Sequence, residues 1–147
     1  MIAIPYKTTR GTWNTISFAS TLYVYPILDL LVAEVPRLWQ AEVRLGLQEA
    51  LINAAKHGNH LDPSKRVSVR FACHDPLYQW IIEDEGEGFV RSSCFDDATP
   101  TFEEGDFCGR GVFILHHVFD CVEWNSKGDR ITLCKAIHRY ARQPAIC

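Results

Sequence analysis

The spacing of apolar and polar residues predicts one strand and then two helices in the first part of the chain. Residues 12–19 alternate loosely between polar positions and β-branched or aromatic ones, which is typical of a strand. Apolar spacing over 22–35 favours a helix with Pro26 near its start. The pattern from Trp39 to His57 is strongly helical, and Gly58 follows as a residue that can take a left-handed conformation past the helix end.

Two hairpins are predicted in the rest of the chain. Alternation over 67–71, a turn at 74–76 and an apolar run over 78–83 indicate the first. A short helix over 112–119 precedes the second, which pairs 121–125 with 130–136. Residues 91–108 show no sustained period and predict a long irregular segment. Strands that arrive as hairpins, with helices grouped between them, favour a two-layer α+β sandwich.

Composition narrows the class of protein. A chain of 147 residues that is 47% apolar is long enough for one core, so we expect a single domain over 1–147 with irregular ends at about 1–10 and 138–147. The net charge of -3 and the lack of a concentrated Lys/Arg run argue against nucleic acid or an anionic membrane as the main partner. A protein partner or a small molecule fits better.

The cysteines and the apolar runs indicate a cytoplasmic protein. No C-x-x-C spacing occurs, and the first residues lack the order of a signal peptide, so we expect reduced thiols. No apolar run approaches the roughly 20 residues that a membrane-spanning helix needs. The six cysteines are Cys73, Cys94, Cys108, Cys121, Cys134 and Cys147.

A polar stripe borders the buried face of the second predicted helix. At about 100° per residue, Glu49, Asn53 and His57 fall on one arc. A carboxylate and an amide four residues apart meet on a helix surface, so the amide oxygen could ligate Mg²⁺ while the carboxylate takes a proton. A solvated helix face that carries these residues by chance is the alternative.

Asp84 comes at the end of a partly buried strand and is followed by two glycines. Gly86 and Gly88 remove side chains from the turn, which permits close approach of the backbone to a flat ligand. An ionised Asp in a concave pocket can accept a hydrogen bond from an exocyclic amine. The alternatives are an acidic surface turn and a calcium loop, although the ligand spacing of an EF-hand is absent.

A third patch, Gly109-Arg110-Gly111, directly precedes the short helix. A glycine-rich entry to a helix leaves unpaired N–H groups and the positive end of the dipole facing outward, which suits phosphate. By itself such a patch is more often a flexible helix start. Neither a P-loop motif nor a G-x-G-x-x-G in a βαβ unit is present.

In their order along the chain, the three patches resemble the N, G1 and G2 boxes of the Bergerat-fold ATPases, the superfamily of gyrase, the heat-shock chaperone ATPases and histidine kinases. They are 49–58, 84–89 and 109–112. The resemblance covers roughly 22–135 and implies a mixed, mainly antiparallel sheet with helices on one face. It also implies that the cofactors are ATP and Mg²⁺.

The resemblance assigns a role to each matching residue. Glu49 would be the catalytic base, Asn53 the Mg²⁺ ligand and Asp84 the adenine anchor. Gly86 and Gly88 would shape the adenine wall, Gly109 and Gly111 would close on the phosphates, and Thr132 would help to hold adenine. Further residues expected to contact the nucleotide are His57, Phe89, Arg110 and Val112.

Among these ATPases, a short chain without an attached dimerisation domain looks like the anti-sigma factor serine-protein kinases. That likeness implies a homodimer that binds a sigma factor or another target and phosphorylates a Ser or Thr on a single-domain antagonist. Residues 91–108 are predicted to form a lid over the phosphates, because this segment is long, irregular and hinged between Gly88 and Gly109. The alternatives are a catalytically silent module of the same fold that binds nucleotide and sequesters a partner, and a metabolic enzyme on an unrelated α+β fold.

Overall fold

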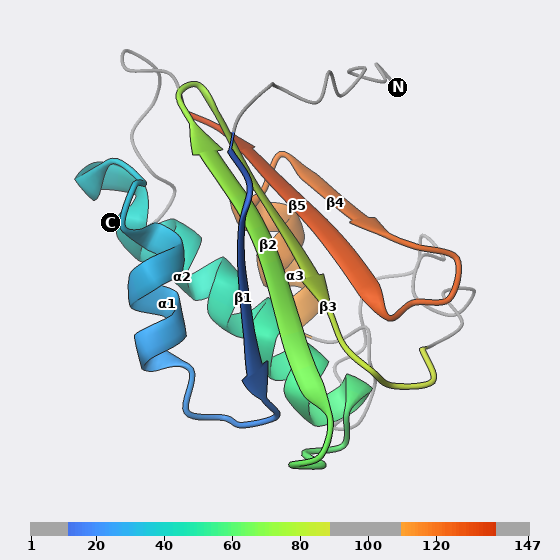
Figure 1. Ribbon diagram of the computed structural model, residues 1–147. Coiled ribbons are helices and arrows are strands. Elements are labelled where there is room, and N and C mark those ends of the chain that lie inside the picture. Colours follow the sequence, from blue (N-terminus) through green and yellow to red (C-terminus); the bar gives the residue numbers. More distant parts are fainter. Residues whose placement is uncertain (1–11, 89–109, 138–147) are drawn as a thin grey trace.

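The computed structural model describes residues 12–88 and 110–137, which form an open five-stranded sheet (Figure 1). The strand order is β1-β2-β3-β5-β4, and every pairing is antiparallel. The strands are β1 (Asn14–Ala19), β2 (Arg66–His74), β3 (Leu77–Glu83), β4 (Cys121–Trp124) and β5 (Arg130–Ala136). Both predicted hairpins, β2–β3 and β4–β5, are confirmed.

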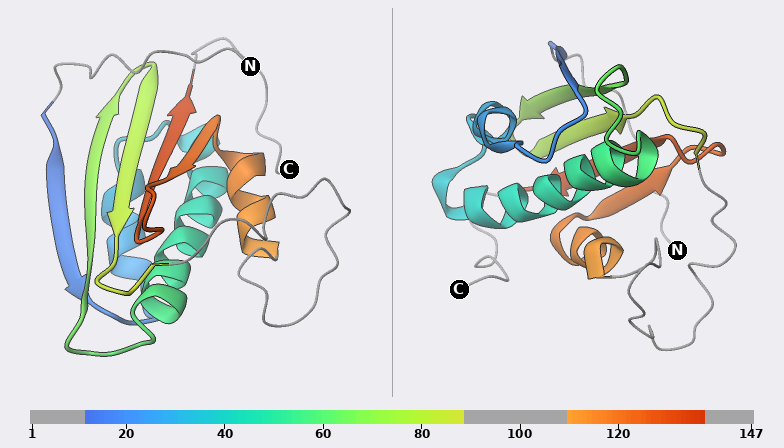
Figure 2. Two further views of the ribbon diagram at one scale, coloured as in Figure 1. Left: turned by 90° about the vertical axis from the view of Figure 1, so that its right-hand side faces the viewer. Right: turned by 90° about the horizontal axis from the view of Figure 1, so that it is seen from below.

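Three α-helices lie on one face of the sheet (Figure 2). They are α1 (Tyr25–Val32), α2 (Arg37–Ile52) and α3 (Arg110–Val118), and a π-helical turn, η1 (Asn53–Gly58), continues α2. The predicted α+β sandwich with a mainly antiparallel sheet and one helical layer is therefore confirmed. Within the described residues, no helix has the length and apolar content needed to span a bilayer.

The core fills the space between the helices and the sheet. Alternate residues of the central strands point toward the helices, as the period of a strand requires. Trp80 on β3 is fully buried, and its indole N–H donates a hydrogen bond of 3.2 Å to the carbonyl oxygen of Leu31 on α1. Other core residues are Leu28, Val43, Leu47, Leu51, Val67, Val69, Ile82, Leu115, Ile131 and Leu133.

A buried ion pair fixes the far end of α3. The Lys135 ammonium lies 3.3 Å from Glu42 Oε1, also donates to the carbonyl oxygen of Val118, and lies 4.8 Å from the centre of the Trp39 ring. Val118 ends α3, so Lys135 satisfies one of the carbonyl groups that a helix leaves unpaired at its C-terminus. The pair thereby ties α3 to both α2 and β5.

Three predictions need correction or lie outside the description. Gly58 does not have a left-handed backbone; the described non-glycine residues with positive φ are His60 (53°) and Leu61 (57°). The helix predicted over 39–57 widens into the π-helical turn after Ile52, because the chain there closes i→i+5 bonds such as Asn59 N–H to Ala54 O (2.9 Å). Phe89, Gly109 and the predicted lid over 91–108 lie outside the described residues.

Candidate functional site

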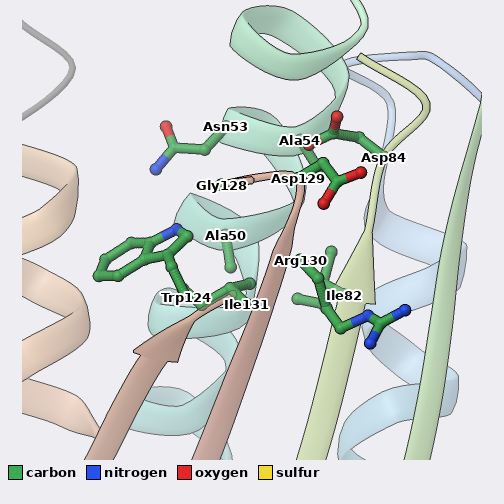
Figure 3. A pocket seen from close by; sticks show the side chains of 10 residues that line it. All are labelled: Ala50, Asn53, Ala54, Ile82, Asp84, Trp124, Gly128, Asp129, Arg130 and Ile131. Atoms are coloured by element: carbon green, nitrogen blue, oxygen red, sulfur yellow. The ribbon is translucent and has the colours of Figure 1, made fainter. Parts of the chain in front are cut away.

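A pocket opens at the end of the sheet where β3 ends and β5 begins, beside the end of α2 (Figure 3). It holds about 340 Å³ of space that is open to solvent. The lining residues are Ala50, Asn53, Ala54, Ile82, Asp84, Trp124, Gly128, Asp129, Arg130 and Ile131.

Asp84 lies directly after β3 and points into this pocket (Figure 3). Its backbone N–H donates to Asp129 O at 2.9 Å, and its Oδ1 accepts the Gly86 N–H at 2.8 Å. Partial burial raises the pKa of the Asp84 carboxyl to about 6, against the opposing effect of the Gly86 hydrogen bond and with a smaller contribution from the Asp129 carboxylate. Near neutral pH the pocket therefore presents a carboxylate that is easily protonated.

Two glycines allow the end of the η1 turn to touch the loop after Asp84. A β-carbon at Gly58 would overlap the Asp84 carboxylate, and one at Gly86 would overlap the carbonyl oxygen of Gly58. Gly88 has φ of +80°, and a β-carbon there would overlap the Lys127 carbonyl. The first and second predicted boxes are thus in direct contact, and both depend on residues without a side chain.

Gly58→Ala is expected to lower the free energy of unfolding by about 1–3 kcal/mol, the usual cost of inserting a methyl group where there is no room. The methyl group would displace the Asp84 carboxylate. Chemical denaturation of the full chain measures the change, with Lys56→Ala as the control because Lys56 is exposed on the same turn. Equal stability of the two variants would show that the loop yields without strain.

Asn59 holds the loop after Asp84 in place through its side-chain amide. It is fully buried and donates hydrogen bonds to Ser20 Oγ (2.8 Å) and to the carbonyl oxygen of Arg66 (3.0 Å). Its Oδ1 accepts the Glu85 N–H at 2.8 Å. The sequence does not reveal this role, because a buried amide and an ordinary loop Asn look alike next to a helix end.

The third box meets the first at the start of α3. A β-carbon at Gly111 would lie 3.0 Å from Glu49 Oε2 and 3.5 Å from Asn53 Nδ2. At the other end of the same helix pair, one at Gly46 would lie 2.9 Å from Val118 Cγ1, so α2 and α3 run antiparallel in close contact. The carboxylate and the amide predicted to act in chemistry therefore lie beside the N-terminal end of α3.

These oxygen atoms suit Mg²⁺ better than a metal that needs a full set of protein ligands. Asn53 lines the pocket and has an amide oxygen that could ligate a metal, and Glu49 offers a carboxylate nearby. Within the described part of the chain, no group of three or more His, Cys, Asp or Glu side chains is placed to hold a metal. Mg²⁺ typically takes only one or two protein oxygens and completes its shell with water and substrate phosphates.

Of the predicted site residues that the structure describes, Asn53 and Asp84 line the pocket. Those that do not line it are Glu49, His57, Gly86, Gly88, Arg110, Gly111, Val112 and Thr132. His57 is exposed on η1, where partial desolvation, Lys56 and His60 lower its pKa. Val112 is buried at the start of α3, and Arg110 is exposed. Thr132 pairs with Ile81, whereas its neighbour Leu133 pairs with the core residue Trp80, so Thr132 lies on the opposite face of the sheet. The prediction that Thr132 faces adenine is therefore out of phase by one residue.

The wall opposite α2 comes from the β4–β5 hairpin, of which the sequence interpretation included Thr132 but none of the residues that line the pocket. Its members are Trp124, Gly128, Asp129, Arg130 and Ile131. The hairpin turn itself was predictable, but its place beside Asp84 follows from the pairing of Glu83 with Arg130. Asn125 donates to Asp129 at 2.6 Å and Lys127 lies 3.2 Å away, which lowers the pKa of the Asp129 carboxyl.

An open antiparallel sheet, a single helical layer and a pocket lined from the first two boxes agree with the Bergerat class of ATPase domains. In agreement, the family model of the histidine kinase-like ATPase domain matches residues 31–135, and the chain belongs to this family.

Two curated proteins show the range of its relatives. The chain is 24% identical to the serine-protein kinase RsbW of Bacillus subtilis (strain 168) over 103 residues, which cover 66% of this chain and 64% of RsbW. It is 35% identical over 83 residues to a 33 kDa chaperonin of Pelobacter propionicus, covering 55% of this chain and 26% of that protein. In both comparisons the chain spans less than two thirds of the relative's length.

Proposed function

We propose that this protein is a serine/threonine protein kinase of the anti-sigma type, which uses ATP and Mg²⁺ to phosphorylate an antagonist protein. The observation that carries the proposal is the proximity of Glu49 and Asn53 to Gly111, next to the pocket that Asp84 enters. The residues proposed as base and metal ligand thereby lie close to the start of α3 and beside this pocket. The similarity to RsbW supports a kinase among the possible ATPases.

Adenine is proposed to lie in the pocket with its exocyclic amine toward Asp84. Ala50, Ala54, Ile82 and Ile131 provide apolar walls that suit a flat base, and Asp84 provides an acceptor for the amine. Gly86, with Gly88, keeps the loop close to this acceptor. The ionised form of Asp84 is the one that accepts a hydrogen bond from an amine.

The phosphates are proposed to extend from this pocket toward α3. Unpaired N–H groups at the start of α3, around Arg110 and Gly111, suit anionic oxygens, and Asn53 would hold Mg²⁺. Bound Mg²⁺ neutralises developing charge on the transferred phosphoryl group. Glu49 would accept the proton of the attacking hydroxyl group.

The proposed partners are a sigma factor or another regulatory target, the antagonist that is phosphorylated, and a second copy of this chain, all in the cytoplasm. The second candidate is a module of the same fold that binds nucleotide and sequesters its partner without turnover. Copurification of partners followed by transfer of labelled phosphate from ATP separates the two. Label on a Ser or Thr of a copurified protein supports the kinase, whereas bound ATP without any transfer supports the binding module.

Nucleotide binding is expected to lower the pKa of Asp84 below its value of about 6 in the free protein. The amine hydrogen bond stabilises the carboxylate over the carboxylic acid, so the proton is lost at lower pH in the complex, and affinity falls as pH drops through about 6. NMR titration of the Asp84 carboxyl carbon with and without ADP measures this directly and avoids confusion with titration of the phosphates. A pKa that stays the same or rises on binding would contradict an amine contact at Asp84.

A further inference from the structure

Two cysteines lie opposite each other in the hairpin that forms one wall of the pocket. Strands β4 and β5 lie side by side (Figure 1), and Cys121, at the start of β4, is paired in register with Cys134 on β5. Cys121 is partly exposed, whereas Cys134 is 2% exposed. Both are present as thiols.

The pairing brings the two sulfur atoms to the same face of the sheet. Val122 and Trp124 pack toward the helices, so Cys121 points to the other face; Cys134 lies on that face as well, because Gln79 on β3 donates to its Sγ at 3.5 Å. Directly opposite residues of antiparallel strands have Cα atoms about 4.5–5.5 Å apart. A disulfide spans Cα separations of roughly 4.4–6.8 Å, a range that includes the spacing typical of directly opposite residues.

We propose that Cys121 and Cys134 form a redox-sensitive pair that a peroxide oxidises to a cross-strand disulfide. The more accessible Cys121 reacts first: its thiolate attacks one oxygen of hydrogen peroxide, the O–O bond breaks, hydroxide leaves and a sulfenic acid forms. The Cys134 sulfur then attacks the Cys121 sulfur, the S–O bond breaks, and water leaves with the Cys134 proton. Two thiols lose two electrons and two protons, and one peroxide becomes two waters.

The disulfide would enclose a part of the chain that matters for the pocket. The closed loop, 121–134, contains every pocket residue that the hairpin supplies: Trp124, Gly128, Asp129, Arg130 and Ile131. Cross-linking the ends of this loop restricts the unfolded chain and the opening of the edge strand β4. Oxidation would therefore stiffen one wall of the pocket. An effect of this stiffening on nucleotide binding rests on the proposed function.

The test uses the full-length reduced protein with hydrogen peroxide in slight excess. After free thiols are blocked with N-ethylmaleimide, mass spectrometry of a non-reducing digest should reveal a cross-linked peptide that joins Cys121 to Cys134. Cys121→Ser and Cys134→Ala should each abolish it. Cys73→Ser is the matched control and should retain it, because burial raises the pKa of the Cys73 thiol to about 11 and leaves that thiol unreactive.

Two results would overturn the proposal. One is a Cys121 thiol that stays reduced, or proceeds to sulfinic acid, without any cross-link to Cys134. The other is a disulfide from Cys121 to a different cysteine in the wild-type protein. The cross-link is read without nucleotide, so its presence or absence is independent of whether the protein is a kinase; ADP affinity of the oxidised protein is a separate measurement.

Discussion

Glu49→Ala is expected to bind ATP at close to wild-type affinity and to transfer phosphate about 10²- to 10⁴-fold more slowly, the usual cost of removing a general base. Glu49 lies beside Gly111 and does not line the pocket that would hold adenine, so its loss should spare the base contacts. The comparison needs the copurified substrate, a rate of labelled phosphate transfer and an ADP titration on the same preparation.

Gln48→Ala is the matched control, since Gln48 is the adjacent, half-buried residue of α2 and is not part of the proposed site. It should transfer phosphate at the wild-type rate. Normal transfer by Glu49→Ala would remove the base from the mechanism and favour the binding module. Loss of ATP binding in that variant would instead assign Glu49 to the integrity of the α2–α3 contact.

Asp84→Asn is expected to weaken ATP binding by roughly 10- to 150-fold, which corresponds to the about 1.5–3 kcal/mol of a hydrogen bond to a charged group. The amide has the same shape as the carboxylate, but its NH₂ group and its lack of charge remove the strong acceptor that the amine requires. Isothermal titration with ATP and Mg²⁺ gives the dissociation constants of the wild-type protein and the variant. The titration is done at pH 7.5 because most of Asp84 is ionised above its pKa of about 6.

Asp29→Asn provides the same chemical change away from the pocket. Asp29 is an exposed residue of α1 whose carboxylate is bound to Arg44 at 2.7 Å, and its replacement should leave ATP affinity unchanged. Unaltered affinity in Asp84→Asn would place the base elsewhere. If Asp84→Asn also loses thermal stability, hydrogen exchange at the Gly86 N–H tests whether the loop has lost its hydrogen bond to residue 84. Lost protection there would assign the weaker binding to a disordered loop.

The periodic parts of this protein were predictable, because one buried face imposes a regular pattern on each element. The β2–β3 hairpin follows from the alternation of apolar and polar residues in its strands. This alternation puts Val67, Val69 and Phe71 of β2, and Trp80 of β3, on the core side. The order of the three glycine and polar patches likewise predicted that distant segments lie close together. Gly111 does lie close to Glu49 and Asn53. Sequence order alone carries this information, since each box is tied to the end of a recognisable element.

What the sequence did not predict depends on pairing between segments that are far apart. The phase of β5 decides that Ile131 lines the pocket and Thr132 does not, and that phase is set by the register with β3. Asn59 and the Lys135–Glu42 pair are buried polar groups whose partners lie on other elements. The amino-acid sequence around a buried polar residue contains no local signal for such partners.

The pocket is assembled from three separate stretches: the end of α2, the end of β3 and the β4–β5 turn. A ligand held there binds only the folded chain, so it stabilises the whole domain by mass action, by about 2.7 kcal/mol at a concentration one hundred times its dissociation constant. The survival of this protein against proteases would then follow the supply of nucleotide.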